Sequence, residues 1–175
     1  SLPSRGLGDV YKRQTKVNIN IAFADNDWGS GDCFRDPNIP FGPHGIDLVQ
    51  REDGKFQLAV VSHHPKESVE MFELRQKDGW MLEWRGCVDV DGQYYFNDVS
   101  LDTSGDFYAS HMFDSDFSLA RALLNVFVKS NTGMVIKWSQ DKSFEELHYT
   151  AGSFPNGIAS VSYTHLTLPT TSDVG

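Results

Sequence analysis

Apolar and polar residues alternate along much of the chain, with the period of a half-buried β-strand. The clearest case is at the start, where Val17, Ile19, Ile21 and Phe23 occupy every second position. Eight further segments predict strands, at Gly45–Gln50, Phe56–Ser62, Ser68–Leu74, Met81–Arg85, Asp98–Asp102, Asp106–Ser110, Gly133–Ser139 and Phe144–Tyr149. The pattern therefore predicts an all-β protein.

Short turn sequences separate these strands. Asp-Gly or Ser-Gly pairs, which favour tight turns, stand at Asp53-Gly54, Asp78-Gly79, Asp91-Gly92 and Ser104-Gly105. Only Ser118–Phe127 has apolar residues at helical spacing, so one short helix is predicted there. Asn20–Pro43 is rich in Asp, Gly, Pro and Asn and reads as a long connection.

A weak repeat organises the strands into larger units. The segments His44–Leu48, Asn97–Leu101 and Asn156–Ser160 each place a His or Asn before a small or acidic residue and a β-branched residue. They start roughly 50 to 60 residues apart, a little longer than the roughly 40–50 residues of common propeller repeats. Repeats that hold several short strands indicate the blades of a β-propeller.

The two ends of the chain are expected to differ in origin from its middle. Asp9–Gln14 is the translation of GATGTGTATAAGAGACAG, an end sequence used in transposase-based library preparation, and the reverse complement of that DNA encodes Val161–His165. We therefore expect residues 1–14 and 161–175 to be non-native tails, and residues 15–160 to be a partial propeller domain. The expected fold is an incomplete β-propeller of roughly two to three blades with one short helix.

Propeller geometry gives the repeat a chemical meaning. The first strand of each blade lies beside the central axis, so the starts of these strands meet at one mouth of the channel. This would gather His44, Asn97 and Asn156. The second strand of a blade returns antiparallel to the same end. We therefore expect His63 and His111, which end second strands, to lie near that cluster.

Asparagine side chains at this place favour calcium. Their amide oxygens are hard neutral donors, and Ca²⁺ takes six to eight oxygen ligands. A single Asn at a strand entry more often caps local backbone groups, but the recurrence of Asn97 and Asn156 at equivalent positions favours a shared site. Two amides cannot hold the ion alone, so carboxylates would have to come from elsewhere.

The two histidines favour proton transfer. Imidazole titrates near neutral pH, so His44 and His63 could take a proton from water. The alternative for either residue alone is a hydrogen-bonded histidine of the core. A serine hydrolase is less favoured, because no G-x-S-x-G sequence occurs within Thr15–Ser160.

Composition narrows the classes of molecule that this protein is expected to bind. The net charge of −9 argues against nucleic acid, whose binding depends on basic patches. No apolar run is long enough to span a bilayer, and membrane association of the parent protein stays open. Cys33 and Cys87 have no metal-site spacing and are too few to define a disulfide framework. Periplasmic, secreted and cytoplasmic locations are all compatible with the sequence.

A set of segments stands in a defined order along the chain: PHGIDL at Pro43–Leu48, LAVVSHH at Leu58–His64, SVEMFEL at Ser68–Leu74, WRGCV at Trp84–Val88, FNDVSLDTSGDFYASHMF at Phe96–Phe113 and FPNGIAS at Phe154–Ser160. This set resembles the paraoxonase/arylesterase branch of the six-bladed propellers related to gluconolactonase (senescence marker protein) and strictosidine synthase. The segments follow the order of the family across most of Phe41–Ser160. The resemblance implies a calcium-dependent hydrolase of lactones and aryl esters.

The same resemblance implies roles for individual residues. Asn97 and Asn156 match ligands of a catalytic Ca²⁺, while Asp98 and the Ile46 carbonyl match ligands of a second, structural Ca²⁺. His44 matches the general base, and His63 matches its relay partner. His64 is the other candidate for the relay, because it precedes Pro65 as in the animal enzymes.

The sequence is compatible with two functions of different classes. The first is hydrolysis of a small-molecule lactone or ester, which the His44–His63 pair favours. The second is a non-catalytic or strictosidine-synthase-like propeller that binds a small molecule, because propellers host many functions. We expect a fragment of the hydrolase to be inactive by itself, since an open propeller leaves sheet edges and core unpaired.

Overall fold

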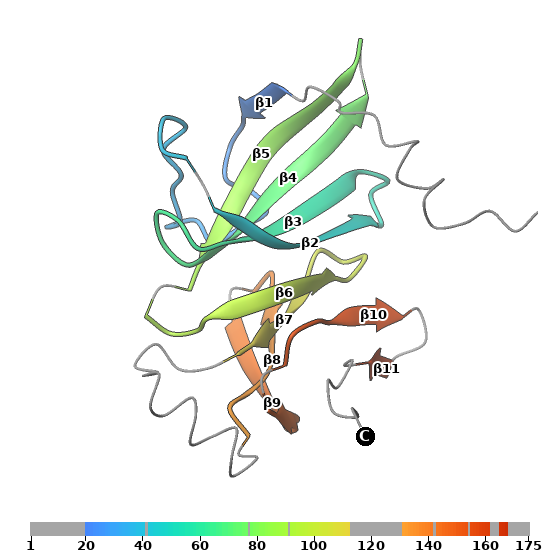
Figure 1. Ribbon diagram of the computed structural model, residues 1–175. Coiled ribbons are helices and arrows are strands. Elements are labelled where there is room, and N and C mark those ends of the chain that lie inside the picture. Colours follow the sequence, from blue (N-terminus) through green and yellow to red (C-terminus); the bar gives the residue numbers. More distant parts are fainter. Residues whose placement is uncertain are drawn as a thin grey trace, which may run out of the picture.

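The computed structural model describes residues 20–40, 42–76, 78–90, 92–112, 131–141, 143–153, 155–161 and 165–167, and every regular element in these ranges is a β-strand. Two larger sheets, one mixed and one antiparallel, stack on each other, and a two-stranded antiparallel sheet follows them (Figure 1). The predicted all-β fold is confirmed. The predicted helix at Ser118–Phe127 lies outside the described residues.

The first sheet has the strand order β1-β5-β4-β3-β2. Its strands are β1 (Asn20–Phe23), β2 (Pro43–Gln50), β3 (Phe56–Ser62), β4 (Ser68–Gln76) and β5 (Trp80–Asp89). β2 to β5 form an antiparallel meander in chain order, and β1 adds parallel to the outer strand β5. Apart from β1, Asn20–Pro43 is a connection, as its composition predicts, and only Pro43 enters β2.

The second sheet has the order β6-β7-β8-β9. Its strands are β6 (Phe96–Leu101), β7 (Phe107–His111), β8 (Gly133–Ser139) and β9 (Ser143–Gly152), followed by a hairpin of β10 (Ala159–Val161) and β11 (His165–Thr167). β2 contacts β6, and β6 contacts β10, so the first strands of successive units lie side by side. This arrangement is that of a partial β-propeller.

A single apolar core fills the space between the two sheets. Val61 from β3 and Met71 from β4 pack in the same cluster as Phe96, Phe107 and Trp138 of the second sheet. Phe107 and Trp138 stack with their ring centroids 5.3 Å apart. Full burial of a side chain of this size stabilises a fold by roughly 1.5–3 kcal/mol. These contacts fix the two sheets, and therefore the starts of β2 and β6, relative to each other.

A polar contact adds to this junction. The Asp47 carboxylate on β2 accepts hydrogen bonds from the Leu101 backbone N–H at 2.7 Å and from the Ser100 hydroxyl at 3.3 Å, both on β6. This contact joins the middle of β2 to the end of β6 and so helps to hold the two strands side by side.

The connection between β1 and β2 is tied to the first sheet by a disulfide. Cys33 and Cys87 are bonded, with their Cα atoms 5.5 Å apart, a pairing that the sequence pattern left undefined. Both cysteines are buried in a second apolar cluster with Phe72 and Trp84. The disulfide thus covers the face of the first sheet that points away from the second. No helix within the described ranges is long and apolar enough to cross a membrane.

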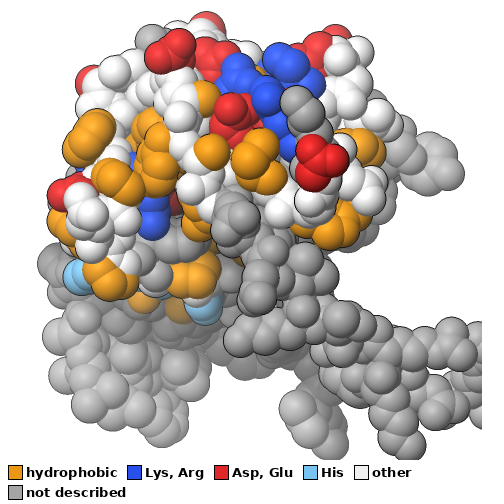
Figure 2. Space-filling view, turned by 90° about the horizontal axis from the view of Figure 1, so that it is seen from above, with side chains coloured by type: hydrophobic (Ala, Val, Ile, Leu, Met, Phe, Trp, Pro, Cys, Tyr) orange, Lys and Arg blue, Asp and Glu red, His pale blue; other side chains and the backbone are white. Residues whose placement is uncertain are grey.

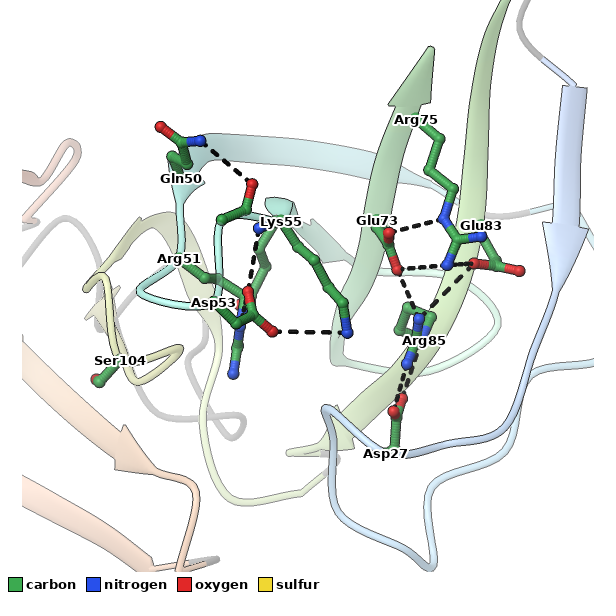
Figure 3. Close-up of polar contacts among 12 residues, drawn as sticks. Asp27, Gln50, Arg51, Asp53, Lys55, Glu73, Arg75, Glu83, Arg85 and Ser104 are labelled. Carbon is green, nitrogen blue, oxygen red and sulfur yellow. Dashed lines mark hydrogen bonds and ion pairs between the residues drawn. The ribbon is translucent and has the colours of Figure 1, made fainter. Parts of the chain in front are cut away.

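Charged residues of β4, β5 and the connection after β1 gather in what we call the arginine cluster: Asp27, Glu73, Arg75, Glu83 and Arg85 (Figure 3). Arg85 forms ion pairs with Asp27 and with Glu73, the latter at 2.5 Å. In the view from above, basic side chains lie directly beside acidic ones (Figure 2).

Opposite charges in this cluster change the pKa of its groups. The pKa of Asp27 is lowered, mainly by its hydrogen bond from Arg85. The pKa of Glu73 is lowered, mainly by its hydrogen bond from Arg75. Asp27 and Glu73 are therefore held in their charged forms by arginines.

Candidate active site

Four residues from distant parts of the sequence meet at one end of the inner strands. His44 lies at the start of β2, His63 directly after β3, Asn97 at the start of β6 and Asn156 shortly before β10. Contacts join them in the order His63, His44, Asn97 and Asn156. We call this group the mouth cluster. His111, also expected nearby, ends β7 opposite Phe96.

Irregular strand pairing explains how His44 and Asn97 reach the mouth. The β2–β3 ladder shifts register between Pro43 and Ile46, and the β6–β7 ladder shifts between Phe96 and Asp98. His44 and Asn97 therefore have no partner position in these ladders. A β-bulge turns a side chain out of the regular alternation and is common beside active sites. The same irregularity recurs at the start of both inner strands.

His44 has a defined tautomer. Its Nδ1 lies 2.8 Å from the backbone carbonyl oxygen of Asn97. A carbonyl oxygen only accepts hydrogen bonds, so Nδ1 must carry the proton and donate it. In the neutral ring, the lone pair is then on Nε2. Since His44 is exposed, this nitrogen is placed to meet water or a substrate.

His63 lies beside His44 and is held from two sides. The two imidazole centroids are 5.0 Å apart and the rings are tilted by 50°. The ring of Tyr95 stacks on His63 with a centroid distance of 4.7 Å. His63 Nδ1 lies 2.9 and 2.8 Å from the two carboxylate oxygens of Glu67. His63 Nε2 is buried and has no hydrogen-bond partner among the described residues.

Sequence reasoning missed Glu67 and Tyr95. Glu67 follows His63 by four residues, but in a loop, where that spacing carries no information about contact. Tyr95 reaches His63 only because the two sheets stack. His64, the other relay candidate, is exposed, and its backbone carbonyl accepts a hydrogen bond from the Ser62 hydroxyl at 2.9 Å.

The two asparagines touch each other directly. Asn97 is buried, and its side-chain Nδ2 contacts both the backbone oxygen and the side-chain oxygen of Asn156. The nitrogen and oxygen of an amide can exchange places by a flip of the side chain. A flip of Asn97 would bring two amide oxygens and one carbonyl oxygen together, which suits a hard cation such as Ca²⁺.

Asp98 lies next to this pair but already binds backbone groups. Its Oδ1 accepts from the Val99 N–H at 3.0 Å, and its Oδ2 accepts from the Ile158 N–H at 3.1 Å. A Cβ atom on Gly45 would come within 2.5 Å of the Asp98 Cα and Oδ1, so only glycine lets β2 approach so closely. The neighbour of Gly45, Ile46, pairs with Val60 on β3, and its side chain is exposed.

The donors at the mouth fit part of a calcium site. Asn97 and Asn156 supply neutral oxygens, and each Asp98 oxygen keeps a lone pair beyond its hydrogen bond. Across the described residues, no three His, Cys, Asp or Glu side chains gather closely enough to hold a metal ion. Further acidic ligands would have to come from elsewhere in the protein.

His111 has a different role from the histidine pair. It is buried at the end of β7, and its Nδ1 accepts a hydrogen bond from the Tyr95 backbone N–H at 3.1 Å. The rings of His111 and Tyr94 are close to perpendicular, with an interplanar angle of 74°. Burial raises the pKa of the Tyr94 hydroxyl, with a further contribution from Glu146. His111 therefore supports the segment that carries Tyr95.

The fold and the mouth cluster define a β-propeller whose inner strands present histidines and amides at one end. The sequence matches the model of the Arylesterase family over residues 34–167, which is most of the chain and includes the whole mouth cluster. The chain therefore belongs to the arylesterase family, whose function is that of an aryl ester hydrolase acting on small molecules. Comparison with curated proteins finds no match.

Proposed function

We propose that the propeller containing this sequence is a calcium-dependent hydrolase of aryl esters and lactones. The observation that carries the proposal is the His44 ring, whose Nδ1 is held by the Asn97 carbonyl oxygen at 2.8 Å, leaving the Nε2 lone pair at the open end of the inner strands. Membership of the arylesterase family supports an ester substrate.

In this mechanism, His44 is the general base. Its Nε2 takes a proton from water while the water oxygen bonds to the acyl carbon. His63, 5.0 Å away between ring centroids, receives this proton on its buried Nε2. The bond between the acyl carbon and the leaving oxygen then breaks, and the phenol or alcohol leaves with a proton returned from the histidine pair.

Calcium would be held by two groups of residues. The amide oxygens of Asn97 and Asn156 would bind the catalytic ion. Asp98 and the Ile46 carbonyl would bind a second ion of structural role. When bound, the catalytic ion supplies polarisation of the ester carbonyl and stabilisation of negative charge on its oxygen.

The test uses the complete propeller that carries these residues, with phenyl acetate and a simple lactone as probes. We expect hydrolysis that is lost in EDTA and restored by added Ca²⁺. Undiminished turnover in EDTA would refute the calcium dependence. Binding of the probes without turnover would favour the non-catalytic or strictosidine-synthase-like alternative.

A matched pair of variants separates the proposed ligands from other amides. Asn97→Ala should raise the Ca²⁺ concentration needed for half-maximal activity at least tenfold, as expected when a metal ligand is removed. Asn38→Ala changes an exposed amide that donates a hydrogen bond to Asp36 in its loop. Its calcium dependence should equal that of the wild type.

A further inference from the structure

The loop between β3 and β4 brings a carboxylate onto the imidazole that the mechanism uses as a relay. Glu67 lies four residues after His63 and directly before Ser68, the first residue of β4. Both carboxylate oxygens lie within 2.9 Å of His63 Nδ1. The two side chains are largely shielded, with exposed fractions of 23% for His63 and 16% for Glu67.

This contact determines which nitrogen of His63 can accept a proton. An ionised carboxylate only accepts hydrogen bonds, so His63 Nδ1 must donate. In the neutral ring, Nε2 then carries the lone pair, and this is the atom that is buried without a hydrogen-bond partner in the described part of the chain. Tyr95 fixes the plane of the ring by stacking on it at an interplanar angle of 9°.

Two contacts that do not involve the Glu67 side chain anchor this loop. The neighbouring Lys66 forms an ion pair with Asp89 at the end of β5. The backbone carbonyl of Glu67 accepts a hydrogen bond from the Val90 N–H at 3.1 Å. Both contacts anchor the loop to the end of β5 without the Glu67 side chain. From this anchored loop, the Glu67 carboxylate contacts His63 Nδ1.

We propose that Glu67 is a positioning residue for the reaction: it fixes His63 as the tautomer protonated on Nδ1 and faces the imidazolium that forms when Nε2 takes up a proton. This inference rests on the proposed hydrolase function. A carboxylate hydrogen-bonded to a functional histidine fixes the tautomer and the orientation of its ring. Glu67 itself touches no substrate in this scheme.

The kinetic test compares Glu67→Ala and Glu67→Gln with two controls in the complete propeller. Lys66→Ala removes the neighbouring loop anchor, and Glu145→Ala removes an exposed carboxylate on β9. Glu67→Ala should lower kcat for phenyl acetate about tenfold to hundredfold, the range for lost partners of functional histidines, with KM changed less than about twofold. Glu67→Gln, whose amide oxygen still accepts from Nδ1, should be intermediate. Both controls should keep the wild-type kcat.

A spectroscopic readout tests the same contact without turnover. The ¹⁵N resonances of His63 should show a protonated Nδ1 in the wild type and in Glu67→Gln, and a shift toward the Nε2-protonated form in Glu67→Ala. A protonated Nε2 and bare Nδ1 in the neutral wild-type ring would overturn the proposal.

The two possible failures are distinguishable. If the wild type hydrolyses ester and Glu67→Ala keeps its kcat, the positioning role is overturned and the hydrolase function stands. If the wild type hydrolyses no ester or lactone, the hydrolase function fails and the positioning role fails with it. A loss of kcat in Glu67→Ala that Lys66→Ala reproduces would assign the effect to the loop and also overturn the role of Glu67.

Discussion

In the arginine cluster, Arg85 contacts the carboxylates of Asp27 and Glu73. In the mouth cluster, by contrast, His44 and Asn97 contact neutral oxygens. In the arginine cluster each charge meets an opposite charge. In the mouth cluster, hydrogen bonds occupy one nitrogen of each histidine and leave the other available. Polar groups of one fold therefore differ in what they offer: the arginine cluster holds paired charges, and the histidines of the mouth cluster keep one ring nitrogen for chemistry.

The largest expected effect is at the mouth. His44→Gln removes the proposed base while keeping a side chain that can bond the Asn97 carbonyl oxygen. Because general-base catalysis contributes about 10²–10⁴-fold, kcat for phenyl acetate should fall by about that factor. Thermal unfolding should occur within about 2 °C of the wild type, since His44 is exposed. His148→Gln, a change of an exposed histidine on β9, is the control and should leave kcat unchanged.

The disulfide, like the arginine cluster, is expected to stabilise the fold. The Cys33→Ser/Cys87→Ser double variant removes a crosslink between residues 54 positions apart. It should lower the free energy of unfolding by about 2–4 kcal/mol, because the unfolded chain gains freedom. Chemical denaturation measures this loss. Unchanged stability would show that the crosslink does not hold the connection to β5, and the folded variant should retain the wild-type kcat.

Within the arginine cluster, the more buried guanidinium should matter more. Arg85→Gln breaks the contacts with Asp27 and Glu73 and should cost about 1.5–3 kcal/mol of unfolding free energy. Its side chain is 12% exposed, whereas that of Arg75 is 41% exposed. Arg75→Gln should therefore cost less than about 1 kcal/mol. Equal losses in denaturation experiments would contradict this ranking.

Acid should weaken the arginine cluster in a defined direction. Arg85 lowers the pKa of Asp27 from its ordinary value of 3.8. A depressed folded-state pKa contributes stability above the ordinary value, and this stability is lost as pH falls toward the folded value. The stability gap between wild type and Arg85→Gln should therefore be constant near neutral pH and shrink below about pH 4. A gap that stays constant down to about pH 2.5 would remove Arg85 as the cause.

Much of the fold could be predicted because local signals and topology agree. Alternation and Asp-Gly turns predict β3 with the bounds of the structure, Phe56–Ser62. The end of β5 was missed: the strand continues past Arg85 to Asp89, because Gly86 interrupts the pattern. The structure places Asn26 where a Cβ of residue 86 would be, so glycine here permits the close approach of a loop.

Of the site, the sequence predicts only what propeller geometry determines, namely which residues lie at the starts of the inner strands. The chain order of the repeat was enough to expect His44, Asn97 and Asn156 at one end of the inner strands. It could not reveal the register shifts that free His44 and Asn97 from their ladders. Nor could it reveal the bond between His63 and Glu67, which depends on the path of a loop rather than on a periodic pattern.

The most direct test of the central claim, that His44 and His63 act as a pair, is a double-mutant cycle in the complete propeller. kcat for phenyl acetate would be measured for His44→Gln, His63→Gln and the double variant. Residues that act as one unit show strongly non-additive losses. The double variant should therefore be no more than about threefold slower than His44→Gln alone. Losses that multiply across the two single variants would contradict the pair.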